Sequence, residues 1–237
     1  RGDLQAARET VARAMPWDWA IESARQPKPA NGSPYWLPDL PGRASLVHRV
    51  EIADWHADAV SPAPGEVEIP EGRIVSDTGE IVWEDVPEDG RVLFDAPRHQ
   101  GVIMRQGSRA TSNMAVDLAS RFGAVQLASL QDDEPIASSG SLLLVAAGRV
   151  TNTGLTWANE ERSAVADWGG PPTRIEPLEA TVTLRGLEGA GAVWLQPLDG
   201  CGQPVGEPQR ATRTPEGFQL ALPARQPTVW YHVTVER

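Results

Sequence analysis

The chain has 237 residues, of which 41% are hydrophobic and 22% charged, and its formal net charge is −11. This composition is that of a globular protein and argues against disorder over the whole length, while the length suits one large β-sandwich or two small domains. The acidic balance disfavours nucleic acid and anionic membrane surfaces as partners, so that a neutral substrate fits better. No apolar run is long enough for a transmembrane helix, and the single cysteine, Cys201, excludes an internal disulfide framework.

Residues 1–45 predict an N-terminal arm or a linker from a preceding domain. Over residues 1–15, apolar side chains recur at steps of three and four, which favours a short helix that Asp3 would cap. Between Pro16 and Pro41, six prolines interrupt any regular element. The same stretch holds Trp17, Trp19, Tyr35 and Trp36. Because a solvated linker rarely contains so many aromatic residues, we expect an irregular arm, rich in Pro and Trp, that packs against a folded body.

Residues 46–237 predict a β-sandwich. Short runs of alternating apolar and polar residues follow one another, separated by turns rich in Gly, Pro and Asp. The expected strands are residues 46–52, 73–83, 91–95, 123–130, 141–150, 180–185, 192–198, 217–222 and 228–235, with weak helical periodicity at 112–121. This pattern is typical of an all-β fold with an antiparallel β-sandwich. We favour one continuous sandwich, and a subdomain boundary near residues 170–180 is the alternative.

The sequence lacks the common catalytic motifs. It has no P-loop, no dinucleotide-binding glycine pattern and no nucleophile elbow. The segment from Asp54 to Asp58 could offer metal ligands, but a solvated loop explains it as well. Acidic residues cluster at 80–85 and 132–134 without singling out the pair of carboxylates that a glycosidase needs. We therefore assign no catalytic residue, no metal ligand and no cofactor.

Several segments carry a resemblance to a known group of proteins. They read SDTGEIVW at residues 76–83, FDAPRHQG at 94–101 and GRVTNTGLTW at 148–157, and the pattern continues at 167–172 and 193–202. Their order resembles the C-terminal all-β regions of bacterial glycoside hydrolases, in which a catalytic (β/α)₈ barrel precedes the β region. The resemblance implies a non-catalytic accessory module that supports a catalytic barrel of the same protein, and it implies that the catalytic acids lie in that barrel. It also implies a secreted or periplasmic setting, because polysaccharides lie outside cells, although the sequence itself does not identify the compartment.

Two motif residues invite a physical interpretation within this resemblance. Asp77-Thr78-Gly79 suits a tight turn between strands. Arg98, which follows Pro97, is expected to pair with a carboxylate in a buried or interfacial network.

The tryptophans suggest a second function, namely carbohydrate binding. The chain has nine Trp, and indole faces stack on the apolar face of a sugar ring while polar neighbours bond its hydroxyl groups. Trp157 and Trp168, with Asn152 and Arg162 beside them, form the predicted site for a polysaccharide or oligosaccharide, on what the sequence indicates is a loop. Structural packing of both tryptophans is the alternative, and we expect Trp83, Trp194 and Trp230 in the core because their strands alternate. A free-standing glycosidase or lyase on a β scaffold is a third alternative.

Overall fold

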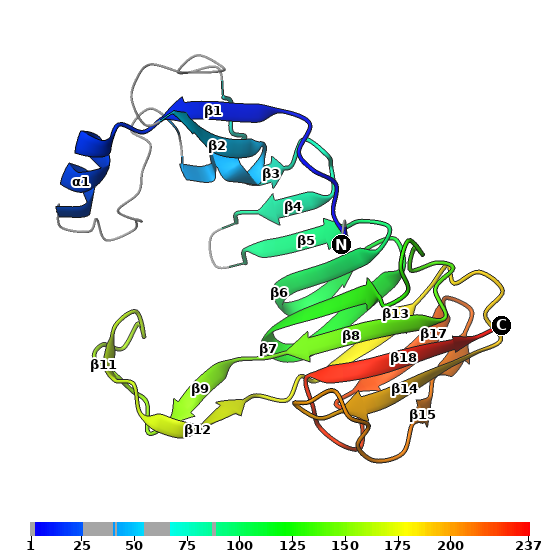
Figure 1. Ribbon diagram of the computed structural model, residues 1–237. Coiled ribbons are helices and arrows are strands. Elements are labelled where there is room, and N and C mark those ends of the chain that lie inside the picture. The colour runs from blue at the N-terminus through cyan, green and yellow to red at the C-terminus, as the bar shows by residue number, and fades with distance from the viewer. Residues whose placement is uncertain (1–2, 26–39, 41, 55–66, 87–88) are drawn as a thin grey trace. The chain divides into compact units, whose positions relative to one another are not determined.

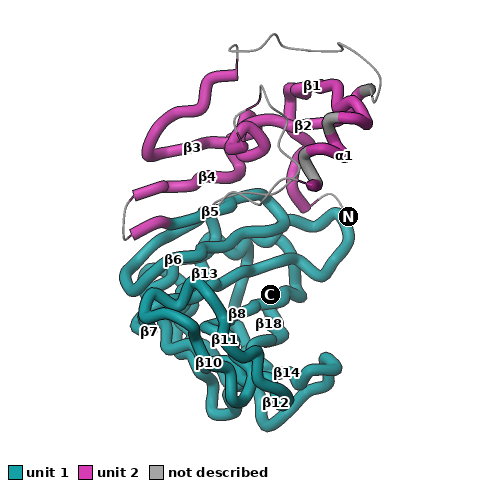
Figure 2. Tube along the Cα trace, turned by 90° about the vertical axis from the view of Figure 1, so that its left-hand side faces the viewer, with its two compact units in different colours: residues 1, 91–237 teal, residues 2–90 magenta. Residues whose placement is uncertain are grey.

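The computed structural model describes residues 3–25, 40, 42–54, 67–86 and 89–237, apart from the side chains of residues 19, 23, 24 and 54. The fold is mostly β, as the sequence predicted, and the chain forms two compact units (Figure 2). In chain order, the first unit is residues 2–90, magenta and labelled unit 2 in the figure, and the second unit is residues 91–237, teal and labelled unit 1. This division falls between Gly90 and Arg91, whereas the sequence suggested a boundary after residue 45. Within the described ranges, no helix combines the length and the apolar character that crossing a bilayer requires.

The first unit, residues 2–90, pairs its strands two by two. Strand β1 runs parallel to β2, and β3 forms an antiparallel hairpin with β4. The bounds are β1 Thr10–Ala14, α1 Trp17–Arg25, η1 Gly42–Leu46, β2 Arg49–Asp54, β3 Arg73–Val75 and β4 Ile81–Glu84. The segment from Asp54 to Asp58, which could offer metal ligands or be a solvated loop, lies largely outside the described residues.

Two expectations for the beginning of the chain are wrong. The first residues do not form a helix, because β1 is a strand in which Val11 and Arg13 are buried, and its partner β2 lies too far along the sequence to influence a local pattern. The Pro-rich stretch does contain a regular element, since α1 begins directly after Pro16, whose carbonyl accepts a hydrogen bond from Ala20 N at 3.0 Å. Proline is tolerated at a helix start because the first N–H groups have no intrahelical partner there.

The expected turn at Asp77-Thr78-Gly79 is present between β3 and β4, with Gly79 at φ 78°. The carboxylate of Asp77 accepts hydrogen bonds from Glu9 N at 2.9 Å and from the His48 ring at 3.1 Å. Burial raises the pKa of Asp77, but hydrogen bonds from the backbone amides of Glu9 and Arg8 and the interaction with the His48 ring lower it. The lowering effects together are larger, so the pKa lies below its ordinary value of 3.8. This turn therefore fastens the segment before β1 to the β3–β4 hairpin.

The second unit, residues 91–237, is an antiparallel sandwich whose two sheets share a strand. One sheet has the order β15-β14-β18-β8-β7-β6-β5, and the other the order β16-β17-β13-β7. The bounds are β5 Arg91–Asp95, β6 His99–Ala110, β7 Met114–Ser129, β8 Ser141–Ala147, β13 Ala180–Leu184, β14 Ala192–Leu198, β15 Gln209–Arg210, β16 Thr212–Thr214, β17 Gly217–Leu222 and β18 Trp230–Glu236. Because β13 pairs with β7 and β18 pairs with β8, strands on both sides of residues 170–180 belong to the same sandwich.

The long strand β7 explains how one strand serves both sheets. Its first residues pair with β13 and its last residues with β8. Between these two parts, the register with β6 shifts at Arg105/Gly107, where Gly107 has φ 138°. A bulge of this kind bends a strand pair and increases its twist. The weak helical periodicity at 112–121 was misleading, since these residues lie mainly in β7.

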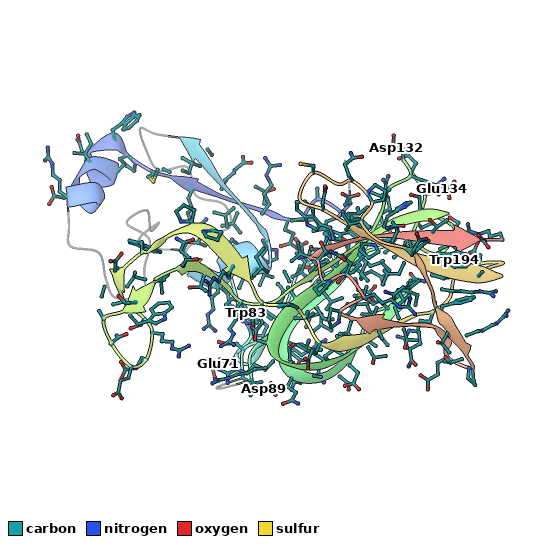
Figure 3. All side chains as sticks on the ribbon, turned by 90° about the horizontal axis from the view of Figure 1, so that it is seen from below. Glu71, Trp83, Asp89, Asp132, Glu134 and Trp194 are labelled. Carbon is teal, nitrogen blue, oxygen red and sulfur yellow. The ribbon has the colours of Figure 1, made fainter. Side chains whose placement is uncertain are left out.

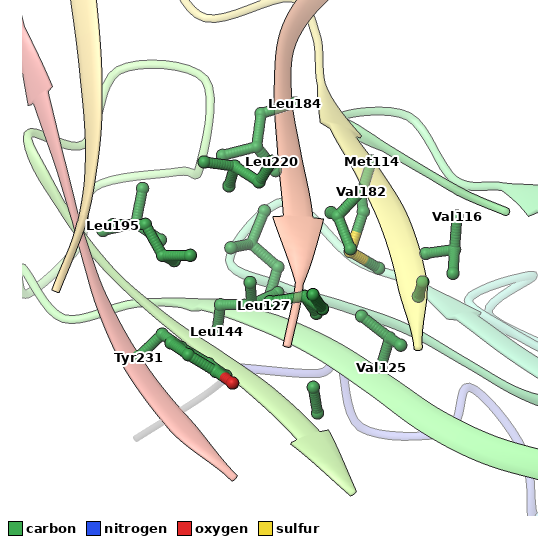
Figure 4. Close-up of a cluster of buried hydrophobic side chains, with 14 of the residues drawn as sticks. Met114, Val116, Val125, Leu127, Leu144, Val182, Leu184, Leu195, Leu220 and Tyr231 are labelled. Atoms are coloured by element: carbon green, nitrogen blue, oxygen red, sulfur yellow. The ribbon is translucent and has the colours of Figure 1, made fainter. Parts of the chain in front are cut away.

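The core lies between the two sheets (Figure 4). It is built from the inward-facing residues of the alternating strands, such as Leu127 and Leu144 from one sheet and Val182 and Leu220 from the other. The predicted alternation of the last strand is confirmed, since Tyr231, Val233 and Val235 are buried.

Not all of the tryptophans expected in the core lie there. Trp230 is 37% exposed on the outer face of β18, so its prediction was wrong. Trp83 and Trp194 are half-buried, each beneath an arginine, with the guanidinium of Arg43 at 5.6 Å from the Trp83 ring and that of Arg210 at 5.8 Å from the Trp194 ring. A strand that is buried on one side only exposes every second residue, whatever its size.

Candidate functional site

A hairpin arm connects the two sheets of the sandwich, and it carries the predicted site residues (Figure 1). We define this arm as residues 148–177. It comprises β9 Val150–Thr153, β10 Thr156–Trp157, β11 Val165–Asp167 and β12 Gly170–Ile175, in which β9 pairs with β12 and β10 with β11. The sequence indicated a loop here. Residues 158–164 are turns and bends, but the residues on either side of them form short strands that the sequence did not predict.

The base of the arm is fixed by a salt bridge and a close backbone approach. The guanidinium of Arg149 donates two hydrogen bonds to the carboxylate of Glu176, from Nε to Oε2 at 2.8 Å and from Nη2 to Oε1 at 3.0 Å. In addition, Glu176 N donates to Arg149 O at 2.8 Å. The Arg149 hydrogen bonds lower the pKa of the Glu176 carboxyl, and the carboxylate raises the pKa of Arg149, so that both groups stay charged. A Cβ atom at Gly148 would lie 2.7 Å from Glu176 O, which explains the glycine at this position.

The tip of the arm is held by the side chain of Asn159. Its Oδ1 accepts hydrogen bonds from Ser163 N at 3.0 Å and from Ala164 N at 3.4 Å, and its Nδ2 donates to Ser163 Oγ at 2.7 Å. Asparagine commonly closes a turn in this way. The turn places Arg162 at φ 55°, in the left-handed region.

A groove of about 1120 Å³ lies where the arm leaves the sandwich. One wall comes from the bend of β6 and β7, with Arg105, Arg121 and Phe122, and the other from the arm. The arm contributes residues from its base and tip, namely Gly148, Arg149, Val150, Thr151, Trp157, Glu160, Glu161, Arg162, Arg174, Ile175 and Glu176. All of these residues belong to the second unit.

Exposed apolar side chains and charged side chains lie together in the groove. Trp157 is 43% exposed, and Phe122, Val150 and Ile175 are exposed beside it on the same groove. Five arginines and three glutamates complete its lining. This combination of an aromatic face with polar hydrogen-bonding groups is the chemistry that binds a sugar, a peptide or a nucleotide.

The structure brings together only part of the predicted site. Trp157 and Arg162 line the groove, whereas Trp168 and Asn152 do not. Trp168 is 70% exposed elsewhere on the arm, and its carbonyl accepts a hydrogen bond from Asn152 Nδ2 at 3.0 Å. Because Asn152 Oδ1 also accepts from Thr173 Oγ1 at 2.9 Å, this side chain ties β9 to β12.

Sequence reasoning missed the groove residues that come from the sandwich. Arg105, Arg121 and Phe122 lie at the bend of β6 and β7. In the arm itself, the sequence also missed Arg174, which lies on β12. One available signal was Arg121-Phe122-Gly123, a break in the apolar alternation that marks the bend. A Cβ atom at Gly123 would overlap the side chain of Leu178, so the glycine lets Leu178, which directly follows the arm, pack on β7.

The acidic cluster at residues 132–134 lies in a turn. Asp132 and Glu134 project outward from the loop after β7 (Figure 3), and Glu134 accepts a hydrogen bond from Ser138 Oγ at 2.6 Å. Arg98 pairs with the carboxylate of Asp133 at 3.4 Å, but this carboxylate is fully exposed, whereas the sequence predicted a partner in a buried or interfacial network. Among the described residues, no group of three or more His, Cys, Asp or Glu side chains is arranged to hold a metal ion.

Comparisons with protein-family models, with curated protein sequences and with solved structures give no match to this chain.

Proposed function

We propose that this chain is a non-catalytic carbohydrate-binding β-sandwich, an accessory module of a glycoside hydrolase. The observation that carries the proposal is the groove at the base of the arm, where Trp157 is 43% exposed and lies among polar side chains. An indole face buries the apolar side of a sugar ring, and the neighbouring charged groups bond its hydroxyl groups.

The size of the groove supports an extended ligand. Small-molecule pockets usually enclose roughly 300–1,000 Å³ and bury most of their ligand. The groove of about 1120 Å³ is lined largely by exposed side chains, so it suits a chain that enters and leaves at both ends. A polysaccharide is such a ligand.

The resemblance of the motifs supports the role of an accessory module. In that arrangement a catalytic barrel of the same protein precedes the β region, and the module holds the barrel near its polysaccharide. Linking a binding module to an enzyme raises the effective concentration of substrate without any new catalytic group.

Affinity electrophoresis of the chain through gels containing soluble glucans, mannans, xylans or galactans tests the proposal. We expect at least one polysaccharide to retard the protein, and we expect Trp157→Ala to weaken binding about tenfold or more, because both buried apolar area and stacking are lost. Trp230→Ala is the matched control, since Trp230 is 37% exposed in the same unit but does not line the groove. Retardation that survives Trp157→Ala, or that Trp230→Ala abolishes equally, contradicts the proposal.

A further inference from the structure

Four arginines of the groove have no partner within the described part of the chain. Arg105, Arg121, Arg162 and Arg174 are exposed, and their guanidinium groups form no salt bridge and no hydrogen bond there. The fifth arginine, Arg149, behaves differently because the carboxylate of Glu176 occupies it at 2.8 and 3.0 Å.

The groove carries unpaired positive charge, although the chain as a whole is acidic. The formal net charge of the chain is −11, yet four unpaired arginines in the groove face only two glutamates, Glu160 and Glu161, that have no arginine partner. Charges separated by more than roughly 8 Å are largely screened at physiological ionic strength. The groove therefore presents a positive field to a ligand that enters it, although the molecule as a whole is acidic.

The hydrogen-bonding geometry of arginine indicates which chemical groups a ligand of the groove carries. The planar guanidinium presents donors in a fork that matches the two oxygens of a carboxylate or two oxygens of a sulfate. Neutral sugar hydroxyl groups offer no charge to offset four guanidinium groups. The structure thus favours an anionic group at intervals along the ligand, next to a ring that stacks on Trp157.

A polysaccharide fits the groove better than a nucleic acid does. A nucleic acid carries a phosphate at every nucleotide, and its affinity rests on neutralising that backbone along a basic surface. Here Glu160 and Glu161 interrupt the arginines, and the lining of the groove has only two aromatic side chains, Trp157 and Phe122, on which successive bases could stack.

We infer that the groove binds an anionic polysaccharide, whose carboxylates or sulfates pair with Arg105, Arg121, Arg162 and Arg174 while one of its rings stacks on Trp157. This inference rests on the proposed carbohydrate-binding function and names the class of its ligand.

Matched polysaccharides in affinity electrophoresis of the full chain test the inference. Polygalacturonate is compared with its methyl-esterified form, and dextran sulfate with dextran, so that each pair differs mainly in charge. We expect retardation by the charged member of one pair, and the pair that responds distinguishes carboxylate from sulfate. Raising the salt concentration is expected to weaken this retardation.

Charge-matched variants locate the binding. Arg121→Gln/Arg174→Gln removes two groove arginines and is expected to weaken binding by about tenfold or more for each lost charged contact. The control Arg213→Gln/Arg225→Gln changes the net charge equally at two exposed arginines outside the groove, and we expect unchanged affinity. Circular dichroism of each variant verifies the fold.

Three results would overturn the inference. Equal retardation by neutral polysaccharides, lost in Trp157→Ala, keeps the carbohydrate-binding function but refutes the anionic ligand. Retardation by no polysaccharide refutes both. Equal retardation of the chain by polyanions of every kind, including single-stranded DNA, with no effect of Trp157→Ala, shows general charge attraction and not a site.

Discussion

Exposure of a single tryptophan says little by itself, and the surrounding side chains decide its role. Trp157 and Trp230 are 43% and 37% exposed, but only Trp157 lies in the groove with unpaired arginines. Trp168 is more exposed than either, at 70%, and lies outside it. The sequence could identify Trp157 and Arg162 from their polar neighbourhood. It could not identify Arg105 or Phe122, because these residues are far from the arm in the sequence and reach it only through the bend of β6 and β7.

Gly123 is expected to be indispensable for the packing at this bend. In Gly123→Ala the new methyl group overlaps Leu178, so we expect the free energy of unfolding to fall by about 1–3 kcal/mol, as in other overpacked cores. Gly170→Ala is the control, because no atom lies within 4 Å of the added group and the change is expected to stay within about 0.5 kcal/mol. Urea titrations followed by tryptophan fluorescence measure both. Equal stability of the two variants would contradict this account of the bend.

Asp77 is expected to make the first unit sensitive to acid. Its native pKa lies below the ordinary value of 3.8, so the charged carboxylate stabilises the native state above that value. The stabilisation is lost as the pH falls through the native pKa. We therefore expect Asp77→Asn to lower the melting temperature clearly near pH 7 and much less near pH 2. A difference between wild type and variant that is independent of pH would refute this, and the exposed Asp132→Asn serves as control.

At the scale of elements, short apolar runs between turn residues were predictable as strands and the others were not. The bounds of β5, β14 and β17 agree with the sequence, because Gly, Pro and acidic residues bound each of these apolar runs. The strands of the arm have no such pattern, since most of their residues are exposed, and polar contacts such as Asn152 with Thr173 hold them. Strand β1 was mistaken for a helix because its stability comes from β2, 39 positions away in register between Thr10 and Arg49.

The arm is expected to depend on its base. Glu176→Gln removes the charge that binds Arg149, and Gly148→Ala forces the backbone away from Glu176 O. We expect both variants to speed amide hydrogen exchange in residues 150–153 and 170–175 and to leave β8 and β13 unchanged, because the core holds those strands. Hydrogen exchange with mass spectrometry measures this. Glu160→Gln, at the tip, is the control, and equal exchange in all three variants would contradict the role of the base.

At the scale of the whole molecule, the second unit has a hydrophobic core of its own. All residues of its core cluster lie between positions 102 and 235, and most of them are on strands of the two sheets. We therefore expect a fragment of residues 91–237 to fold alone and to unfold in a cooperative urea transition. A fragment without such a transition would show that its core is insufficient.

The central claim is that a sugar chain binds in the groove beside Trp157, and the indole N–H signals in a ¹H–¹⁵N NMR titration test it most directly. Oligosaccharides cut from the polysaccharide that retards the protein are added stepwise, with the signals assigned from single Trp variants. We predict that the Trp157 signal shifts in proportion to binding while those of Trp194 and Trp230 stay in place. A titration that shifts Trp230, or shifts other residues and leaves Trp157 unchanged, would place the ligand elsewhere and contradict the account.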